Sequence, residues 1–306
     1  MNAQFLLGKI IRSVITLWIT VSLAFVLLRL AGDPAEALIP PDAGPEVVEY
    51  YRVKWGFDKP IHVQYFKYFG ALVRGDFGFS LHTGKPVHDI VFQKVPNTLL
   101  LGGTAFLIAL FVGIPLGVLA ALKRNSLIDR VVMSFSVFAF AMPNFFFGLL
   151  LILSAAMIFH TFVGAGELTF WSLILPACTL GLANVGSLAR FTRSTVLETL
   201  NKPFMAAALA KGVGMSRRIV HHALPNAAIP IVTLLGLSLG GLIAGSVVTE
   251  TVFGWPGVGS LLIRAVQTRD LGVVQFIVLM VASTMTAVNL MVDLLYLVID
   301  PRIRVK

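Results

Sequence analysis

The chain has 306 residues, of which 57% are hydrophobic and only 13% are charged, and its mean hydropathy is +0.87. Soluble domains carry roughly 25% charged residues, so this composition excludes a soluble enzyme. It also excludes a disordered chain, which needs low hydrophobicity and high charge. The net charge of +9 fits the excess of Lys and Arg in cytoplasmic loops of membrane proteins better than nucleic-acid binding, because the aromatic residues lie in apolar runs.

Six long charge-free stretches predict an all-α integral membrane protein, since a bilayer core needs about 20 apolar residues per helix. The stretches are continuous, whereas the strands of a membrane barrel alternate between apolar and polar residues. In chain order they cover residues 13–28, 95–122, 131–166, 168–189, 223–249 and 271–292. Four prolines inside them are expected to kink the helices, namely Pro115, Pro143, Pro176 and Pro230. The first stretch is expected to be a permanent anchor, because Arg29 interrupts the place where a signal peptide would have small residues.

The distribution of basic residues predicts how the chain is oriented in the membrane. The two ends of the chain and the connections 123–130 and 190–222 hold 14 of the 24 Lys and Arg residues. We therefore expect a multi-pass protein of the cell inner (plasma) membrane whose N- and C-termini are both cytoplasmic. It would have an N-terminal transmembrane helix (1–30), an external, periplasmic lobe (31–96) and a five-helix core (97–306) that contains the cytoplasmic segment 190–227.

The external lobe has the pattern of a small folded unit. Pro45 can begin a helix and Gly56 can end it, with Val47, Tyr51 and Trp55 on one face. The further aromatic residues of the lobe favour packing onto the helix ends over an aromatic substrate site.

A glycine turn in the cytoplasmic segment predicts a helical hairpin. Pro203 can begin a short helix that is rich in alanine, a strong helix former. Gly212 and Gly214 are expected to end this helix. The first arm of the hairpin therefore ends just after Lys211.

The second arm of the hairpin is expected over 217–224, capped by Ser216 and ended by Pro225. The pattern alone fits two structures equally well. One is an amphipathic hairpin that lies along the membrane surface. The other is a docking surface, in which Ala207 and Ala208 let another protein approach closely.

This segment resembles the signature loop of binding-protein-dependent ABC importer permeases. In that loop Glu-Ala-Ala is followed after three residues by Gly, and after nine more by Ile-x-Leu-Pro. With every spacing kept, the matching residues are Ala206, Ala207, Ala208, Gly212, His222, Ala223, Leu224 and Pro225. Ala206 replaces the Glu of the pattern and His222 replaces the Ile. The peptide branch of the family commonly has Ala-Lys-Gly and His-x-Leu-x-Asn here, which matches Lys211 and Asn226.

Further stretches resemble the dipeptide, oligopeptide and nickel permeases of this family, so the resemblance covers nearly the whole chain. They are residues 30–34, 75–80, 86–87, 250–259, 269–270 and 300–302. In the last external loop we expect a tight turn where only glycine permits close approach. Its residues are Glu250, Phe253, Trp255, Pro256, Gly257 and Gly259.

The resemblance implies a type I ABC importer permease with six transmembrane helices, the family member that carries the external lobe. Its partners would be a homologous second permease, two cytoplasmic ATPases and an extracytoplasmic solute-binding protein. The chain would form half of the translocation pathway and perform no covalent chemistry, so ATP and Mg would bind only to the ATPases. The cargo implied is a di- or oligopeptide, and relatives also carry nickel or glutathione.

Other functions find little support in the residues. The string from Gly78 to Pro86 lacks the spacing and the Ser or Thr of a phosphate-binding loop, and no hydrolase motif occurs. The histidines of the lobe fit no metal-ligand spacing; they are His62, His82 and His88. A secondary transporter that works without ATPases is the alternative, but the chain has no visible repeat of one half. Asp293 is the one carboxylate within a span. Because it is close to the membrane–water interface, we interpret it as a structural polar contact rather than part of a proton relay.

Overall fold

The computed structural model of the chain describes residues 3–30, 44–159 and 170–299. Within these residues the secondary structure is helical, apart from an isolated antiparallel bridge between Phe79 and Pro86. This confirms the prediction of an all-α protein. The chain forms two compact units, Met1–Thr98 with Pro256–Ala287 and Leu99–Trp255 with Val288–Lys306, and each is described by itself below.

The first unit contains the N-terminal span, the lobe and the start of the last span. Its helices are α1 (Ala3–Leu30), α3 (Pro45–Trp55), α4 (Ile61–Val73), α5 (Val87–Phe92), α15 (Val258–Gln267) and the first part of α16 (Leu271–Ile299). The predicted lobe helix is confirmed, since Pro45 begins α3 and Gly56 ends it with a left-handed φ of 74°. Apolar residues of α5, α15 and α16 form the core of this unit.

A buried hydrogen bond joins the loop before α5 to the loop before α16. The hydroxyl of Ser80 donates to Oδ2 of Asp270 at 2.5 Å, and both residues are almost completely buried. Close packing accompanies this bond, because a Cβ at Gly272 would lie 2.8 Å from the carbonyl oxygen of Phe79. The lobe is thus attached to a segment about 190 residues further along the chain.

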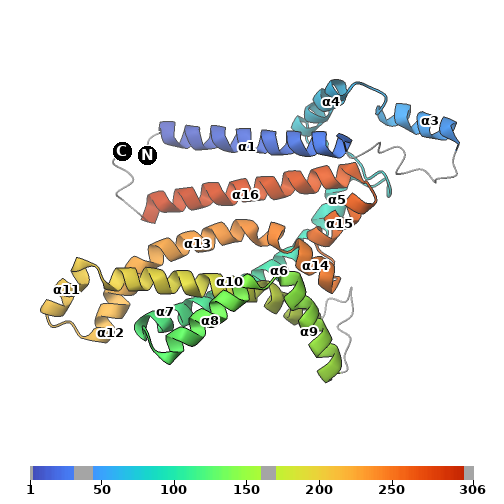
Figure 1. Ribbon diagram of the computed structural model, residues 1–306. Coiled ribbons are helices and arrows are strands. Elements are labelled where there is room, and N and C mark those ends of the chain that lie inside the picture. Colours follow the sequence, from blue (N-terminus) through green and yellow to red (C-terminus); the bar gives the residue numbers. More distant parts are fainter. Residues whose placement is uncertain (1–2, 31–43, 160–169, 300–306) are drawn as a thin grey trace. The chain divides into compact units, whose positions relative to one another are not determined.

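The second unit is built around one long helix. Its elements are α6 (Val95–Ile108), the π-helix η1 (Ala109–Gly113), α7 (Ile114–Leu122), α8 (Leu127–Ala141), α9 (Asn144–Phe159), α10 (Phe170–Leu200), α11 (Pro203–Ala210), α12 (Met215–Arg218), the π-helix η2 (Ile219–Ala223), α13 (Leu224–Gly245) and α14 (Val247–Phe253). Helix α10 contacts α7, α8, α9 and α13, and Figure 1 shows it between α13 on one side and α7 and α8 on the other.

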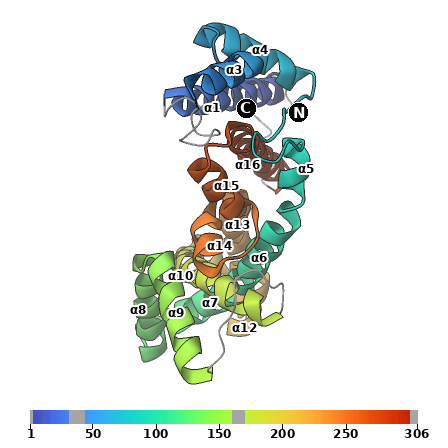
Figure 2. The same ribbon diagram turned by 90° about the vertical axis from the view of Figure 1, so that its right-hand side faces the viewer.

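Small residues allow the helices of the second unit to pack closely against α10. A Cβ at Gly117 of α7 would lie 2.5 Å from the carbonyl oxygen of Ala189 on α10. A Cβ at Gly186 of α10 would lie 2.8 Å from the carbonyl oxygen of Ser136 on α8. Small residues are typical of such interfaces between membrane helices, where backbones must approach each other. Figure 2 shows α8 and α9 beside α10 from another side.

Five described helices are long and apolar enough to cross a membrane, and a sixth span results if one bent pair of helices is counted. The spans are Leu7–Leu30, Val87–Leu122, Ser172–Leu200, Met215–Leu239 and Leu271–Asp293, with the pair Leu127–Ala141 and Asn144–Ile158 as the sixth. The expected kink at Pro143 in the run 131–166 is confirmed, and it is a sharp break, because the two helices of the pair are bent by 102°. The break occurs at Met142, whose extended backbone is the conformation that the following proline, Pro143, imposes on it.

Two prolines lie directly after π-helical segments. Helix α7 has Pro115 in its first turn after η1, and α13 has Pro225 in its first turn after η2. A proline ring clashes with the carbonyl four residues earlier in a regular helix, and the wider π turn makes room for it. The prediction that Pro225 ends the second arm was therefore wrong, since the helix continues from Met215 to Leu239.

Candidate functional site

The helical hairpin, which we define as residues 203–223, joins α10 to α13 at one end of the second unit (Figure 1). Its first arm is α11 and its second arm is α12 with η2, and α11 contacts α12. Pro203 occupies the first turn of α11, where its missing N–H costs nothing. The first arm therefore begins where the sequence predicted it.

Gly212 ends the first arm in a left-handed conformation, with φ of 73°. The N–H of Val213 donates to the carbonyl of Ala208 at 3.1 Å, and the N–H of Gly212 donates to that of Leu209 at 2.9 Å. These two bonds form a Schellman motif, which requires a residue that tolerates positive φ. No atom lies within 4 Å of a Cβ built on Gly212, so its backbone angle rather than close packing explains the glycine.

Gly214 has a different role from Gly212. Its φ is −61°, a value that any residue adopts, and it is the N-cap of α12. The prediction that Ser216 caps the second arm was wrong, because the helix already begins at Met215. Ser216 is an exposed residue within its first turn.

Exposure divides the alanines of the first arm into two groups. Ala206 and Ala207 are exposed, and Leu209 beside them is 57% exposed. Ala208 is only 8% exposed and is buried within this chain. The expectation that Ala208 offers a free face to another protein is therefore wrong, and the available face consists of the exposed side chains around it.

The second arm enters α13 without a break. The amide of Asn226 donates to the carbonyl of His222 at 2.8 Å, so these two motif residues are one helical turn apart and joined. Ala223 is fully buried, and Leu224 packs against the cluster that includes Val196 of α10. Pro225 is exposed, as is Lys211 at the end of the first arm.

The predicted external turn follows α14 and has its own Schellman motif. The N–H of Trp255 donates to the carbonyl of Glu250 at 2.8 Å, and that of Gly254 donates to Thr251 at 3.3 Å. Gly254 has φ of 64° and is the glycine that this turn requires. The turn was expected over residues 254–259 on the ground of close approach, and within that string Gly257 and Gly259 do not have positive φ.

Three residues of the predicted set lie in or just after α14, with Glu250 and Phe253 in the helix and Trp255 after Gly254. Glu250 is completely buried and accepts a hydrogen bond from the hydroxyl of Ser246 at 2.9 Å. The ring of Phe253 lies against Gly148 of α9, where a Cβ would be 2.9 Å from Cε2 of the ring. Trp255 is buried in a cluster with residues of α6 and α10, namely Leu101, Ala105, Ala177 and Leu180.

After the turn, the chain is held by the start of α6 within the first unit. The amide of Asn97 donates to the carbonyl of Pro256 at 2.9 Å. The hydroxyl of Thr98 accepts the N–H of Val258 at 2.8 Å, which satisfies a donor at the N-terminus of α15. Gly257 is the N-cap of this helix. The segment that follows the turn is therefore anchored by two side chains at the start of α6.

One buried ion pair was missed at the sequence level. Asp129 on α8 is paired with Arg193 on α10. The pattern Ser126-x-x-Asp129 predicts a helix start, and Ser126 does cap α8. No local pattern, however, indicates a partner 64 residues away.

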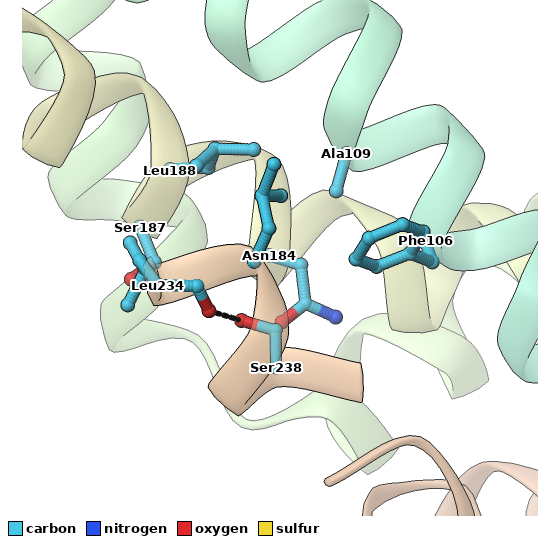
Figure 3. A pocket seen from close by; sticks show the side chains of 8 residues that line it. Phe106, Ala109, Asn184, Ser187, Leu188, Leu234 and Ser238 are labelled. Atoms are coloured by element: carbon cyan, nitrogen blue, oxygen red, sulfur yellow. Dashed lines mark hydrogen bonds between the residues drawn. The ribbon is translucent and has the colours of Figure 1, made fainter. Parts of the chain in front are cut away.

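A small cavity of about 40 Å³ lies between η1, α10 and α13. Figure 3 shows Asn184 and Ser238 facing one another across it, near Phe106 and Ala109. The hydroxyl of Ser238 donates to the carbonyl of Leu234 at 2.8 Å. This volume holds about one water molecule and is too small for a peptide.

The lobe histidines are not gathered into a metal site by the described part of the chain, where no three His, Cys, Asp or Glu side chains meet. His82 lies 2.7 Å from the carbonyl oxygen of Thr268, and His88 lies 3.3 Å from the carboxylate of Asp89. Asp293 is half-buried in α16.

Comparison with known proteins decides what this arrangement belongs to. The family described as "Binding-protein-dependent transport system inner membrane component" matches residues 113–305, and its N-terminal counterpart matches residues 2–102. The chain belongs to this family. It is thus an ABC importer permease subunit with an N-terminal extension and a multi-pass membrane protein, and the secondary-transporter alternative is set aside.

Among similar proteins are the glutathione transport system permease proteins GsiC of Salmonella choleraesuis (strain SC-B67) and Escherichia coli (strain K12). Each is 37% identical over 304 residues, which is 99% of this chain and 99% of the relative. A solved structure of the MetNI methionine ABC transporter in an inward-facing conformation matches with a TM-score of 0.56 and 18% identity. The match covers 70% of this permease and 98% of that chain, and it supports the type I importer fold.

Proposed function

We propose that this permease forms half of a translocation pathway with a homologous second permease, and that two cytoplasmic ATPases and an extracytoplasmic solute-binding protein complete the transporter. The family match supports this assembly. In it the chain performs no covalent chemistry, and ATP and Mg bind to the ATPases. Closure of the ATPases would switch the pathway between its outward-open and inward-open states. Binding of ATP drives this switch only if it favours one of the two states, because a ligand shifts an equilibrium only through differential affinity.

The helical hairpin is the proposed contact with one ATPase. Its motif residues are Ala206, Ala207, Ala208, Lys211, Gly212, His222, Leu224, Pro225 and Asn226. The exposed ones supply the surface, whereas Gly212 and the bond between His222 and Asn226 set the shape of its two ends. Because the second arm continues directly into α13, a displacement of the hairpin by the ATPase would also move this transmembrane span.

The proposed orientation places the hairpin and both termini in the cytoplasm and the lobe (31–96) outside, between the first span (1–30) and the core (97–306). The turn formed by Glu250, Phe253, Trp255, Pro256, Gly257 and Gly259 then lies on the external side. Its anchored geometry suits it to support the pathway near the site where a binding protein delivers solute.

The proposed solute is a short peptide, with glutathione as the first compound to test. The observation that carries this is the 37% identity to glutathione permeases over 99% of both chains. Glutathione is itself a tripeptide, so it belongs to the di- and oligopeptide class that the sequence motifs favour. Nickel is the second candidate from the sequence motifs.

Uptake by the assembled transporter tests this proposal. The permease would be reconstituted in proteoliposomes with its partner subunits, and uptake of labelled glutathione, a dipeptide and nickel would be measured with and without internal ATP. We expect saturable, ATP-dependent uptake of glutathione that excess short peptide reduces. Uptake of nickel alone would contradict the peptide assignment, and uptake that needs no ATPase would contradict the assembly.

A further inference from the structure

The first compact unit contains a cavity of about 530 Å³ to which the proposed transport role assigns no part. This volume lies within the range of small-molecule sites. The cavity lies between the end of α1, the lobe and the start of α16, all within this unit. Its lining includes the aromatic residues Trp55, Phe57, Tyr68, Phe77 and Phe79 and the polar residues Arg29, Asp76, Ser80 and Gln275.

The cation of this cavity is held in place by aromatic rings. The guanidinium carbon of Arg29 lies 4.6 Å from the ring centre of Phe57 and 5.3 Å from that of Phe25. Phe25 in turn stacks on Tyr68 at 5.5 Å. Arg29 follows Val21 and Phe25 at helical spacing, and both of these are buried. The cation therefore lies under the lobe rather than in open solvent.

Two further donors line the same cavity. The Nε2 atom of Gln275 is buried and has no hydrogen-bond partner among the described residues. The phenol of Tyr68 is the second donor, and burial raises its pKa to about 12. A ligand with several acceptor oxygens and a negative charge, such as a phosphate diester, fits such a group of donors.

The carboxylate of Asp76 makes the lining zwitterionic. Its Oδ1 atom accepts the N–H of Gly78 at 3.0 Å, and Asp76 is an exposed residue of the cavity lining. A ligand with an ammonium group next to its phosphate would match both charges. The head group of phosphatidylethanolamine has this composition.

The surface beside the cavity favours a lipid over a free solute. Leu23, Leu27 and Leu30 form an exposed apolar stripe on the last two turns of α1. The stripe ends at the turn that carries Arg29, the next-to-last residue of a span, and this is where lipid head groups lie. The acyl chains of a lipid can cover such an apolar stripe, whereas a free peptide has no long apolar chain to place on it.

We propose that this cavity binds the head group of one phosphatidylethanolamine molecule, with its phosphate at Arg29 and Gln275 and its acyl chains along α1. The bound lipid would join the N-terminal span to the lobe and to α16. This proposal goes beyond the transport function and does not depend on the identity of the solute.

Photolabelling tests the proposal in the assembled transporter, reconstituted in nanodiscs with a phosphatidylethanolamine whose photoreactive group sits on an acyl chain close to the ester, so that the ammonium group stays free. We expect labelled peptides around Arg29 and Gln275, and about tenfold less labelling in Arg29→Gln, which corresponds to about 1.4 kcal/mol. Gln275→Leu should also reduce labelling, and it keeps the test valid if Arg29→Gln disturbs the lobe. Arg12→Gln, at the other end of the same span, is the matched control and should label like the unaltered protein.

Three results would overturn the proposal. The first is equal labelling in Gln275→Leu and the unaltered protein. The second is labelling that excess glutathione removes but excess phosphatidylethanolamine does not, which would make the cavity a solute site. The third is equal competition by phosphatidylglycerol, which would remove the role assigned to Asp76. Because the readout needs no transport, failure here is distinguishable from failure of the transport assignment.

Discussion

Arg193 on α10 holds Asp129 on α8 through two parallel hydrogen bonds, from Nε to Oδ1 at 2.5 Å and from Nη2 to Oδ2 at 2.7 Å. The same carboxylate accepts the N–H of Asn125 at 2.9 Å. Arg193 lies about two turns before the end of α10 at Leu200. The pair therefore fixes the start of α8 against the helix that leads into the hairpin.

The first prediction follows from the burial of this pair. Asp129→Asn leaves the Arg193 cation half-buried without its counter-charge, which typically costs about 3 kcal/mol or more. We expect a clearly lower midpoint of thermal unfolding for the purified protein. Glu198→Gln is the matched control, because its pair with Lys202 spans 3.6 Å and is well exposed, so its loss should cost less than about 1 kcal/mol. Equal shifts in both variants would contradict a structural role for the buried pair.

A second prediction separates two glycines that are two residues apart. Gly212→Ala puts a side chain at φ of 73°, which costs about 1 kcal/mol or more and should open the end of the first arm. Gly214→Ala, at φ of −61°, should be neutral or slightly stabilising because it restricts the unfolded chain. Limited proteolysis of the hairpin and the transport rate measure both effects. Faster cleavage in Gly214→Ala than in Gly212→Ala would show that the Schellman motif does not hold the arm.

The third prediction distinguishes contact from folding within the first arm. Leu209 is 57% exposed, so Leu209→Asp should leave abundance in the membrane unchanged while it lowers transport and weakens retention of the ATPases. Ala208 is buried, so Ala208→Asp should cost a few kcal/mol and lower abundance itself. Normal transport and normal ATPase retention in Leu209→Asp would mean that this exposed face contacts no subunit.

A fourth prediction concerns orientation. In a Cys178→Ala background, Lys85→Cys and Gln267→Cys should react with an impermeant thiol reagent added from outside, whereas Lys123→Cys and Ser216→Cys should react only after the membrane is opened. All four positions are exposed, so accessibility depends on the side of the membrane. The reverse pattern would place the helical hairpin outside and separate it from cytoplasmic ATPases.

The sequence by itself determined the features that depend on composition and on the local backbone. Charge-free runs predicted helical spans because only helices and closed barrels satisfy every backbone group in a bilayer, and continuous apolar runs lack the alternation of barrel strands. Pro45, Gly56, Pro203 and Gly212 marked helix ends correctly, since ring closure and the missing Cβ act on the backbone at one position. The family signature around Gly212 was also legible, because its spacing lies within one short segment.

Only the tertiary structure decided which side chains meet and which are buried. The pairs Asp129 with Arg193 and Ser80 with Asp270 join residues 64 and 190 positions apart, and no local pattern contains that distance. Pro143 marked a kink within the run 131–166, but only the structure gave the size of the bend, 102°, because hydrophobicity records burial in lipid but not direction. Ala207 and Ala208 are adjacent residues of the same type in the sequence, yet the rotation of α11 about its axis exposes the first and buries the second. Rotation and register arise from packing between helices, and these contacts form only when the whole chain has folded.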